Sequence, residues 1–380
     1  MSAWRAISLI VLSATTGVVA PAAFADGDPV AGNTLYQAHC FVCHGLASDN
    51  QFKILTGAGN PSAILDAIQN APEMSRVADL ATLTVANVTD IAAYLLAVRS
   101  GTPAAPNYQG LWWKADESGW GVNFAHQGDQ IFATWYTYDT SGNAYWLTML
   151  AGLTTPGGNA YHGDIYVSVG PSFNNFAGAN ASTKVGDGTI TFSDANTGTF
   201  AYNLNMGTGG ATTAISQSKP ITRFVLDASS AQPVCSYQSA PDLTAATNYQ
   251  DLWWLPSESG WGANFAHQGN TIYATWYTYD AKAAGNNAPL WLAALLTRQG
   301  TTNVFSGNMY RTSGARFDNF KASDVVQPAT VVGNATLTFA DGNDATFHYV
   351  TNGTGNLPAA DQTKSITRLL FAPPAATVCQ

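Results

Sequence analysis

The sequence carries few charged residues. Asp, Glu, Lys and Arg make up 10% of its 380 residues, and the formal net charge is −9. An acidic chain offers little to phosphate groups, which argues against nucleic acids and anionic membrane surfaces as partners. Glycine and the aromatic residues are plentiful instead, at 35 residues and 12%. This composition is typical of secreted, β-rich proteins.

Long hydrophobic runs are missing beyond the N-terminus, so we expect no transmembrane segment. At the start, Arg5 precedes a mostly apolar stretch over residues 7–20, and Ala-Phe-Ala follows at residues 23–25. This pattern predicts a signal peptide over residues 1–25, cleaved after Ala25, because the apolar run is too short to span a bilayer. We therefore expect a periplasmic or secreted protein.

Cysteine is scarce as well, with four in the chain, and two of them lie in Cys-Phe-Val-Cys-His at residues 40–44. This spacing is the attachment signature of a c-type haem. One helical turn presents Cys40 and Cys43 to the two haem vinyl groups, and His44 follows as the proximal iron ligand. A zinc site would need a second ligand pair, but the next cysteine is Cys235. A thioredoxin-like cysteine pair would need a βαβ context, which the flanking sequence does not supply. We therefore predict one covalently attached haem c.

Apolar residues at helical spacing predict helices near residues 29–38, 61–70 and 84–98. With the haem motif, this arrangement resembles class I cytochrome c, in which a last helix carrying an aromatic residue, here Tyr94, crosses the first. The resemblance implies an all-α domain over residues 26–100.

The resemblance also implies a methionine as the second axial ligand. Met74 is the one methionine between the haem motif and the last predicted helix. It could instead fill the core, as methionine often does, and His39 is a rival that faces away from the distal side. A Met–His pair raises the reduction potential relative to that of a bis-histidine haem. It also fills the sixth iron position, which favours electron transfer over catalysis at the iron. If Met74 is not bound, a peroxidase-like or gas-sensing activity is open again.

The remaining chain contains an internal repeat. Residues 107–139 align without gaps to residues 248–280, with 25 of 33 positions identical. Each repeat is of domain size, so we predict two tandem homologous domains rather than a solenoid. The expected organisation is a signal peptide (1–25), a cytochrome c domain (26–100), a linker (101–106), a first β domain (107–235), a linker (236–247) and a second β domain (248–379).

Alternating and aromatic-rich segments predict about eight strands in each repeat, which suits an antiparallel up-and-down barrel, with a β-sandwich as the alternative. A tryptophan in the first strand and an arginine in the last weakly resemble the closure of calycin barrels. The pairs are Trp112 with Arg223 and Trp253 with Arg368. Asp251 stands where the first repeat has Gly110, which departs from that pattern.

The best-retained block of the repeats offers a candidate ligand site. Its polar and aromatic members are Glu117, Trp120 and His126 in the first copy and Glu258, Trp261 and His267 in the second. These side chains could bind a sugar, an aromatic compound or a polymer, or they could pack the core and hold a turn. Each histidine could also be a copper or zinc ligand, but one histidine and one glutamate per copy are too few to define a metal site.

Cys235 and Cys379 end their repeats at equivalent positions, which predicts a disulfide in an oxidising compartment. Free thiols or pairing with another molecule are the alternatives. No serine nucleophile elbow, HExxH motif or phosphate loop occurs in the sequence.

The sequence therefore predicts a monohaem cytochrome that exchanges single electrons with a redox partner protein. Its paired β domains would bind a partner, a polymer or a small ligand. One alternative is an oxidoreductase whose β-domain substrate passes electrons to the haem. Another is a haem-based sensor or surface-binding protein.

Overall fold

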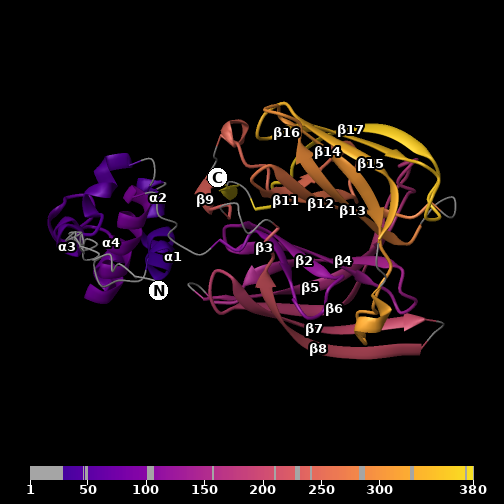
Figure 1. Ribbon diagram of the computed structural model, residues 1–380. Coiled ribbons are helices and arrows are strands. Elements are labelled where there is room, and N and C mark those ends of the chain that lie inside the picture. The colour runs from indigo at the N-terminus through magenta and orange to yellow at the C-terminus, as the bar shows by residue number, and fades with distance from the viewer. Residues whose placement is uncertain are drawn as a thin grey trace, which may run out of the picture. The chain divides into compact units, whose positions relative to one another are not determined.

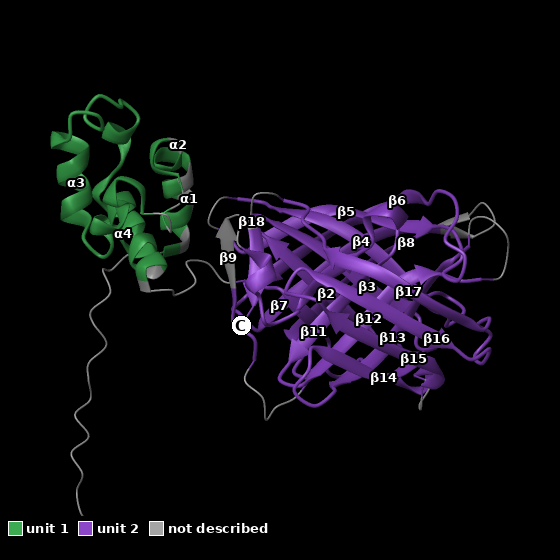
Figure 2. Cartoon of the chain, turned by 90° about the horizontal axis from the view of Figure 1, so that it is seen from above, with its two compact units in different colours: residues 1–102 green, residues 103–380 purple. Residues whose placement is uncertain are grey.

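The computed structural model describes residues 29–45, 47, 50–100, 107–155, 158–208, 211–226, 232–239, 242–281, 287–325, 329–372 and 375–379. The expected signal peptide and the expected linker at residues 101–106 lie outside these ranges. The chain forms two compact units, residues 1–102 and 103–380, which Figure 2 colours green and purple.

The first unit is helical. Its elements are α1 (Pro29–His39), α2 (Phe41–His44), the 3-10 helix η2 (Gln51–Gly57), α3 (Pro61–Asn70), the 3-10 helix η3 (Leu80–Thr82) and α4 (Val85–Ser100). The three predicted helices are confirmed as α1, α3 and α4. Asn60 caps the N-terminus of α3, because its side-chain oxygen accepts a hydrogen bond from the Ala63 N–H at 3.1 Å.

Helices α1 and α4 contact each other closely at Gly32. A Cβ atom there would lie 1.9 Å from the Asp90 carbonyl oxygen, so any side chain would push the helices apart. One turn further on, the Tyr36 ring lies 5.2 Å from that of Tyr94, and both residues are buried. The Tyr36 hydroxyl donates to the Gly45 carbonyl at 2.9 Å. The helix crossing thereby supports the chain directly after the haem motif.

The second unit contains two closed eight-stranded antiparallel barrels (Figure 1), as predicted, and the β-sandwich alternative is wrong. The first barrel comprises β1 (Gly110–Trp113), β2 (Gly121–Gln127), β3 (Gln130–Tyr138), β4 (Ala144–Leu153), β5 (Ala160–Val169), β6 (Ala181–Phe192), β7 (Thr197–Thr208) and β8 (Ala211–Arg223). The second comprises β10 (Asp251–Trp254), β11 (Gly262–Gln268), β12 (Thr271–Tyr279), β13 (Pro289–Arg298), β14 (Val304–Arg311), β15 (Thr330–Phe339), β16 (Asp344–Thr351) and β17 (Ala360–Arg368).

Each barrel closes between its first and last strands at the predicted tryptophan–arginine pair. Trp112 lies opposite Arg223, whose guanidinium is 4.9 Å from the indole ring. In the second barrel the corresponding distance between Trp253 and Arg368 is 5.2 Å. Asp251, the departure from the first repeat, lies 2.9 Å from Arg368 and forms a buried ion pair with it. The second barrel thus pairs its closing arginine with a carboxylate that the first barrel lacks.

The two barrels pack on each other through reciprocal contacts. The Trp146 indole of β4 donates to the Thr278 carbonyl at 2.7 Å, and the equivalent Trp291 of β13 donates to the Thr137 carbonyl at 2.8 Å. Equivalent surfaces therefore contact each other, as in an isologous dimer.

This packing explains the burial of β2. The alternating pattern predicts one strand face that carries Trp120, Val122, Phe124 and His126. In the structure Trp120 precedes the strand, and β2 is buried on both faces. The second barrel covers its outer side, where the Gln127 side-chain amide donates to the Leu369 carbonyl at 2.8 Å.

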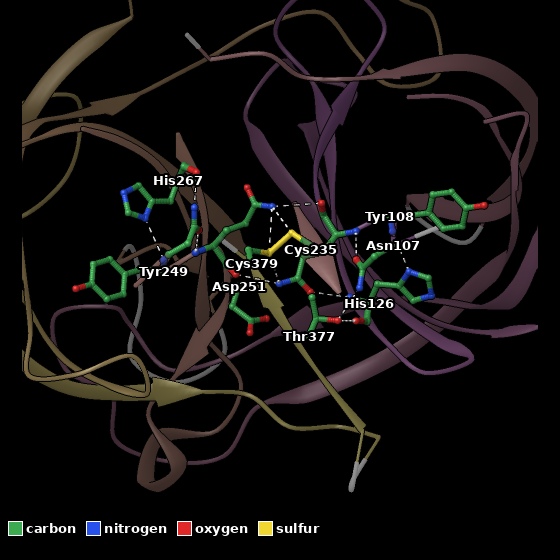
Figure 3. Close-up of a disulfide and its surroundings, with 12 residues drawn as sticks. Asn107, Tyr108, His126, Cys235, Tyr249, Asp251, His267, Thr377 and Cys379 are labelled. Carbon is green, nitrogen blue, oxygen red and sulfur yellow. Dashed lines mark hydrogen bonds between the residues drawn. A yellow bond between two sulfur atoms is a disulfide. The ribbon is translucent and has the colours of Figure 1, made fainter. Parts of the chain in front are cut away.

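A small two-stranded sheet joins the ends of the repeats (Figure 3). Strand β9 (Cys235–Ser239) pairs with β18 (Ala375–Cys379), and the predicted disulfide between Cys235 and Cys379 is confirmed. Residues 236–247, which we expected to be a plain linker, contain most of β9 and the 3-10 helix η4 (Leu243–Ala245). The 3-10 helices η5 (Pro256–Glu258) and η6 (Ala322–Asp324) lie in barrel loops.

Candidate haem site and barrel mouths

The haem motif consists of Cys40, which separates α1 from α2, and the four residues of α2. The amide of Cys40 donates to the Tyr36 carbonyl at 2.8 Å, and the amide of His44 donates to the Cys40 carbonyl at 3.0 Å. Cys40 is buried while Cys43 is exposed, and neither is in a disulfide. Burial, and secondarily the neighbouring Cys43, raises the pKa of the Cys40 thiol to about 11. The turn therefore holds two thiols and an imidazole within five consecutive residues.

His44 lies beside an exposed aromatic side chain. Its Nδ1 atom is 3.5 Å from the Gln51 carbonyl oxygen, and the edge of its ring faces Phe52 at a centroid distance of 5.8 Å. Phe52 is 80% exposed. The large exposed apolar residues that the structure describes in this unit are Phe41, Phe52, Val77 and Val85. Of these, Phe52 is the side chain that a ring contact places beside the candidate iron ligand.

The two candidates for the second axial ligand differ in their surroundings. Met74 is half-buried in the segment between α3 and η3. His39 is engaged elsewhere, because its Nδ1 atom lies 2.6 Å from a carboxylate oxygen of Asp79. The structure therefore gives His39 a partner other than iron.

Comparison with known families assigns the helical unit. Residues 27–95 match the family model described as "Cytochrome C oxidase, cbb3-type, subunit III". The N-terminal unit is thus a cytochrome c domain, and this family implies haem c and a redox partner. The match does not extend to the two barrels, and no curated protein matches the chain. Among the described residues, no helix is long and apolar enough to cross a membrane.

In the β unit, the structure brings Glu117 and Trp120 together with a residue that the sequence pattern did not single out. The Lys219 ammonium lies 2.6 Å from a Glu117 carboxylate oxygen, and the Trp120 indole donates to the same oxygen at 3.1 Å. Burial alone would raise the pKa of Glu117, but hydrogen bonds from Lys219 and Lys114 outweigh it and lower the pKa.

The second barrel repeats this arrangement. The Lys364 ammonium lies 2.7 Å from one Glu258 carboxylate oxygen, and the Trp261 indole donates to the other at 3.0 Å. Lys219 and Lys364 occupy equivalent positions in the two repeats. This recurrence in the sequence could have identified them as partners of the glutamates.

We call the end of each barrel that carries this glutamate–tryptophan–lysine group its mouth. A loop from the other barrel closes each mouth. Phe317, from the loop after β14, lies 5.8 Å from the Trp135 ring, and its carbonyl accepts a hydrogen bond from the Tyr202 hydroxyl at 3.2 Å. Reciprocally, Phe173 lies 5.8 Å from the Trp276 ring. The loops share the pattern Phe-Asx-Asn-Phe at residues 173–176 and 317–320, a recurrence that could have identified them.

Little free space is left in the first mouth. A cavity of about 10 Å³ lies among Glu117, Trp120, Trp135, Tyr202, Lys219 and the closing loop. This volume holds about one water molecule. The Trp135 indole N–H is buried and has no hydrogen-bond partner among the described residues, so a single water is a suitable acceptor. The retained glutamate and tryptophan therefore support the barrel–barrel contact.

The two candidate histidines lie at the opposite end of β2 and β11 from these mouths. His126 is fully buried, stacks on Tyr108 at 5.5 Å, and accepts a hydrogen bond from the Tyr108 amide at 3.1 Å. Burial lowers the pKa of His126 to about 3 and that of His267 to about 4. Within the described part of the chain, no three His, Cys, Asp or Glu residues are grouped to hold a metal. The histidines thus serve as neutral core residues.

Proposed function

We propose that the protein is an exported monohaem c-type cytochrome that carries single electrons. The observation that carries this proposal is the turn formed by Cys40, Cys43 and His44 inside a matched cytochrome c domain. The two thiols would hold the haem through thioether bonds, and His44 would be the proximal ligand through Nε2. When bound, the haem supplies an iron that cycles between ferrous and ferric states.

The residues around the turn suit these roles. The Gln51 carbonyl lies on the Nδ1 side of His44, which favours presentation of Nε2 to the iron. The Tyr36 hydroxyl fixes the Gly45 carbonyl next to it. Met74 is the proposed distal ligand, because His39 is bonded to Asp79. A thioether ligand would favour the ferrous state and leave no vacant position for oxygen or peroxide.

The N-terminal sequence supports export. Residues 1–25 have the charge, apolar run and Ala-Phe-Ala ending of a signal peptide. Attachment of haem c and an oxidised Cys235–Cys379 pair both suit the periplasm or the exterior. The matched family is described as a subunit of cytochrome c oxidase, which supports a redox protein as partner.

The barrel pair is proposed to bind a macromolecule with its outer surface. Support comes from the mouth of the first barrel, because its cavity of about 10 Å³ excludes even a monosaccharide. In a thermal-shift panel, sugars and small aromatics should leave the melting temperature unchanged. In a separate pull-down, an immobilised polymer or partner protein should retain this protein. A small ligand that raises the melting temperature by several degrees would contradict this role.

Optical spectra and a redox titration test the electron-carrier role. We expect Met74→Ala to lose low-spin character, to bind carbon monoxide rapidly when reduced, and to have a lower reduction potential. Met206→Ala, a half-buried methionine in β7, is the matched control and should behave as wild type. Cys43→Ser should weaken or abolish covalent haem attachment. An unchanged spectrum in Met74→Ala would remove Met74 as a ligand.

A further inference from the structure

The segment that carries Met74 is weakly attached to the rest of its domain. In residues 71–83, Leu80 is the one buried side chain. Most hydrogen bonds of this segment are local turns, such as Val77 N–H to the Met74 carbonyl at 3.0 Å and Leu80 N–H to the Val77 carbonyl at 3.1 Å. A segment held this loosely would pay a conformational entropy cost to present a ligand.

One hydrogen bond reaches beyond the segment and its flank. His39 Nδ1 lies 2.6 Å from Asp79 Oδ2, and this hydrogen bond joins residues that are 40 positions apart in the sequence. Among the described residues, every other hydrogen bond of residues 71–83 stays inside the segment or reaches Ala67 in α3. Asp79 precedes η3 but does not cap it with its side chain, so its carboxylate is available to His39.

The position of this bond links it to the proposed haem ligands. His39 is the last residue of α1 and directly precedes Cys40, one of the two proposed attachment residues. Asp79 lies five residues after Met74 and next to the buried Leu80. The bond therefore joins the Met74 segment to the turn where the haem would be attached.

We infer that His39 and Asp79 form a clip that holds the 71–83 segment and thereby positions Met74 toward the haem iron. The inference rests on the proposed role of Met74 and adds two positioning residues to it. Without the clip, the segment samples more conformations. The thioether then leaves the iron more often, and an external ligand competes more easily.

Imidazole titration of the ferric, full-length holoprotein measures this competition. We expect His39→Ala and Asp79→Ala each to bind imidazole about fivefold more tightly than wild type, because one hydrogen bond of modest net strength is lost. The double variant should bind no more tightly than either single variant, since both remove the same bond. Asp79→Asn keeps an acceptor oxygen for His39 and should stay near wild type.

Asp66→Ala is the matched control. It removes the same charge in the same domain, but its bond to Asn70 at 2.6 Å stays within α3. Only variants with wild-type haem content are compared. Wild-type imidazole affinity in both His39→Ala and Asp79→Ala, or an equal shift in Asp66→Ala, would overturn the clip. Met74→Ala separates the two proposals: if it too binds imidazole like wild type, the ligand assignment itself has failed.

Discussion

The indole nitrogen of Trp291 donates a hydrogen bond to the carbonyl oxygen of Thr137 at 2.8 Å, which ties the second barrel to the first. Trp291 is 4% exposed, and its ring also packs on Tyr136 and Tyr138 of the first barrel at 5.6 and 5.7 Å. Trp146 makes the equivalent bond in the opposite direction. Two residues at matching positions thus anchor an interface inside one chain.

Truncation of either anchor should destabilise the barrel pair. We expect Trp291→Ala or Trp146→Ala to lower the free energy of unfolding by roughly 3–5 kcal/mol, because a large buried ring leaves a cavity in the interface. Urea denaturation followed by fluorescence measures the loss. Trp113→Ala, a half-buried tryptophan that packs on Phe224 at 5.1 Å, should cost clearly less. Equal losses at Trp113 and Trp291 would contradict the anchor role.

Acid should destabilise the barrels through their buried histidines. Burial lowers the pKa of His126 to about 3 and that of His267 to about 4, whereas an unfolded histidine has a pKa near 6.5. The stabilisation is complete above pH 6.5. As the pH falls toward 4, it is lost by up to about 1.4 kcal/mol per pH unit for each histidine, because the unfolded chain binds protons that the folded chain excludes.

We therefore expect the two histidines together to account for a loss of about 3–4 kcal/mol between pH 7 and pH 5. Urea titrations at both pH values measure it. His126→Asn offers a side-chain acceptor for the Tyr108 amide, which donates to His126 at 3.1 Å, but cannot be protonated in this range. It should remove about half of the loss, and a pH dependence identical to wild type would speak against this account.

The closing ion pair of the second barrel should be sensitive to mutation. Asp251 and Arg368 are 3% and 0% exposed at their side chains and lie 2.9 Å apart. Asp251→Ala should cost roughly 3–5 kcal/mol, because it leaves a guanidinium buried without its counter-ion. The exposed pair of Asp164 and Lys184, at 2.7 Å, is the comparison. Asp164→Ala should change stability by less than about 1 kcal/mol. If the two substitutions have equal effects, burial is not what makes the Asp251 pair matter.

Removal of the disulfide should weaken the β unit without altering its fold. Cys235 and Cys379 are 144 positions apart, and in the chain-entropy view a crosslink of this length contributes up to about 5 kcal/mol. We expect the Cys235→Ser, Cys379→Ser double variant to unfold at lower urea concentration while its circular dichroism spectrum stays native. Haem absorbance is the internal control and should be unchanged. An unaltered urea midpoint would show that the barrel contacts alone set the stability.

Much of the architecture is local in origin and could be predicted from the sequence. The order of apolar and polar residues determines which segments become helices or strands. The helices of the first unit and the eight-stranded barrels could therefore be predicted from the sequence. The match of residues 107–139 to 248–280 required two similar domains. The spacing of Cys40, Cys43 and His44 is enough by itself to indicate haem chemistry, because the attachment motif is contained in five consecutive residues.

The roles of the retained barrel residues depend on contacts between distant segments, which only the tertiary structure decides. Glu117 and Trp120 acquire Lys219 as a partner about 100 residues later, and Phe317 from a loop of the other barrel lines the same cavity. Glu117 and Trp120 precede β2 and His126 lies near its far end, so one continuous sequence block is divided between two sites. Local pattern determines each strand, but the packing of one barrel on the other determines which faces remain open to a ligand.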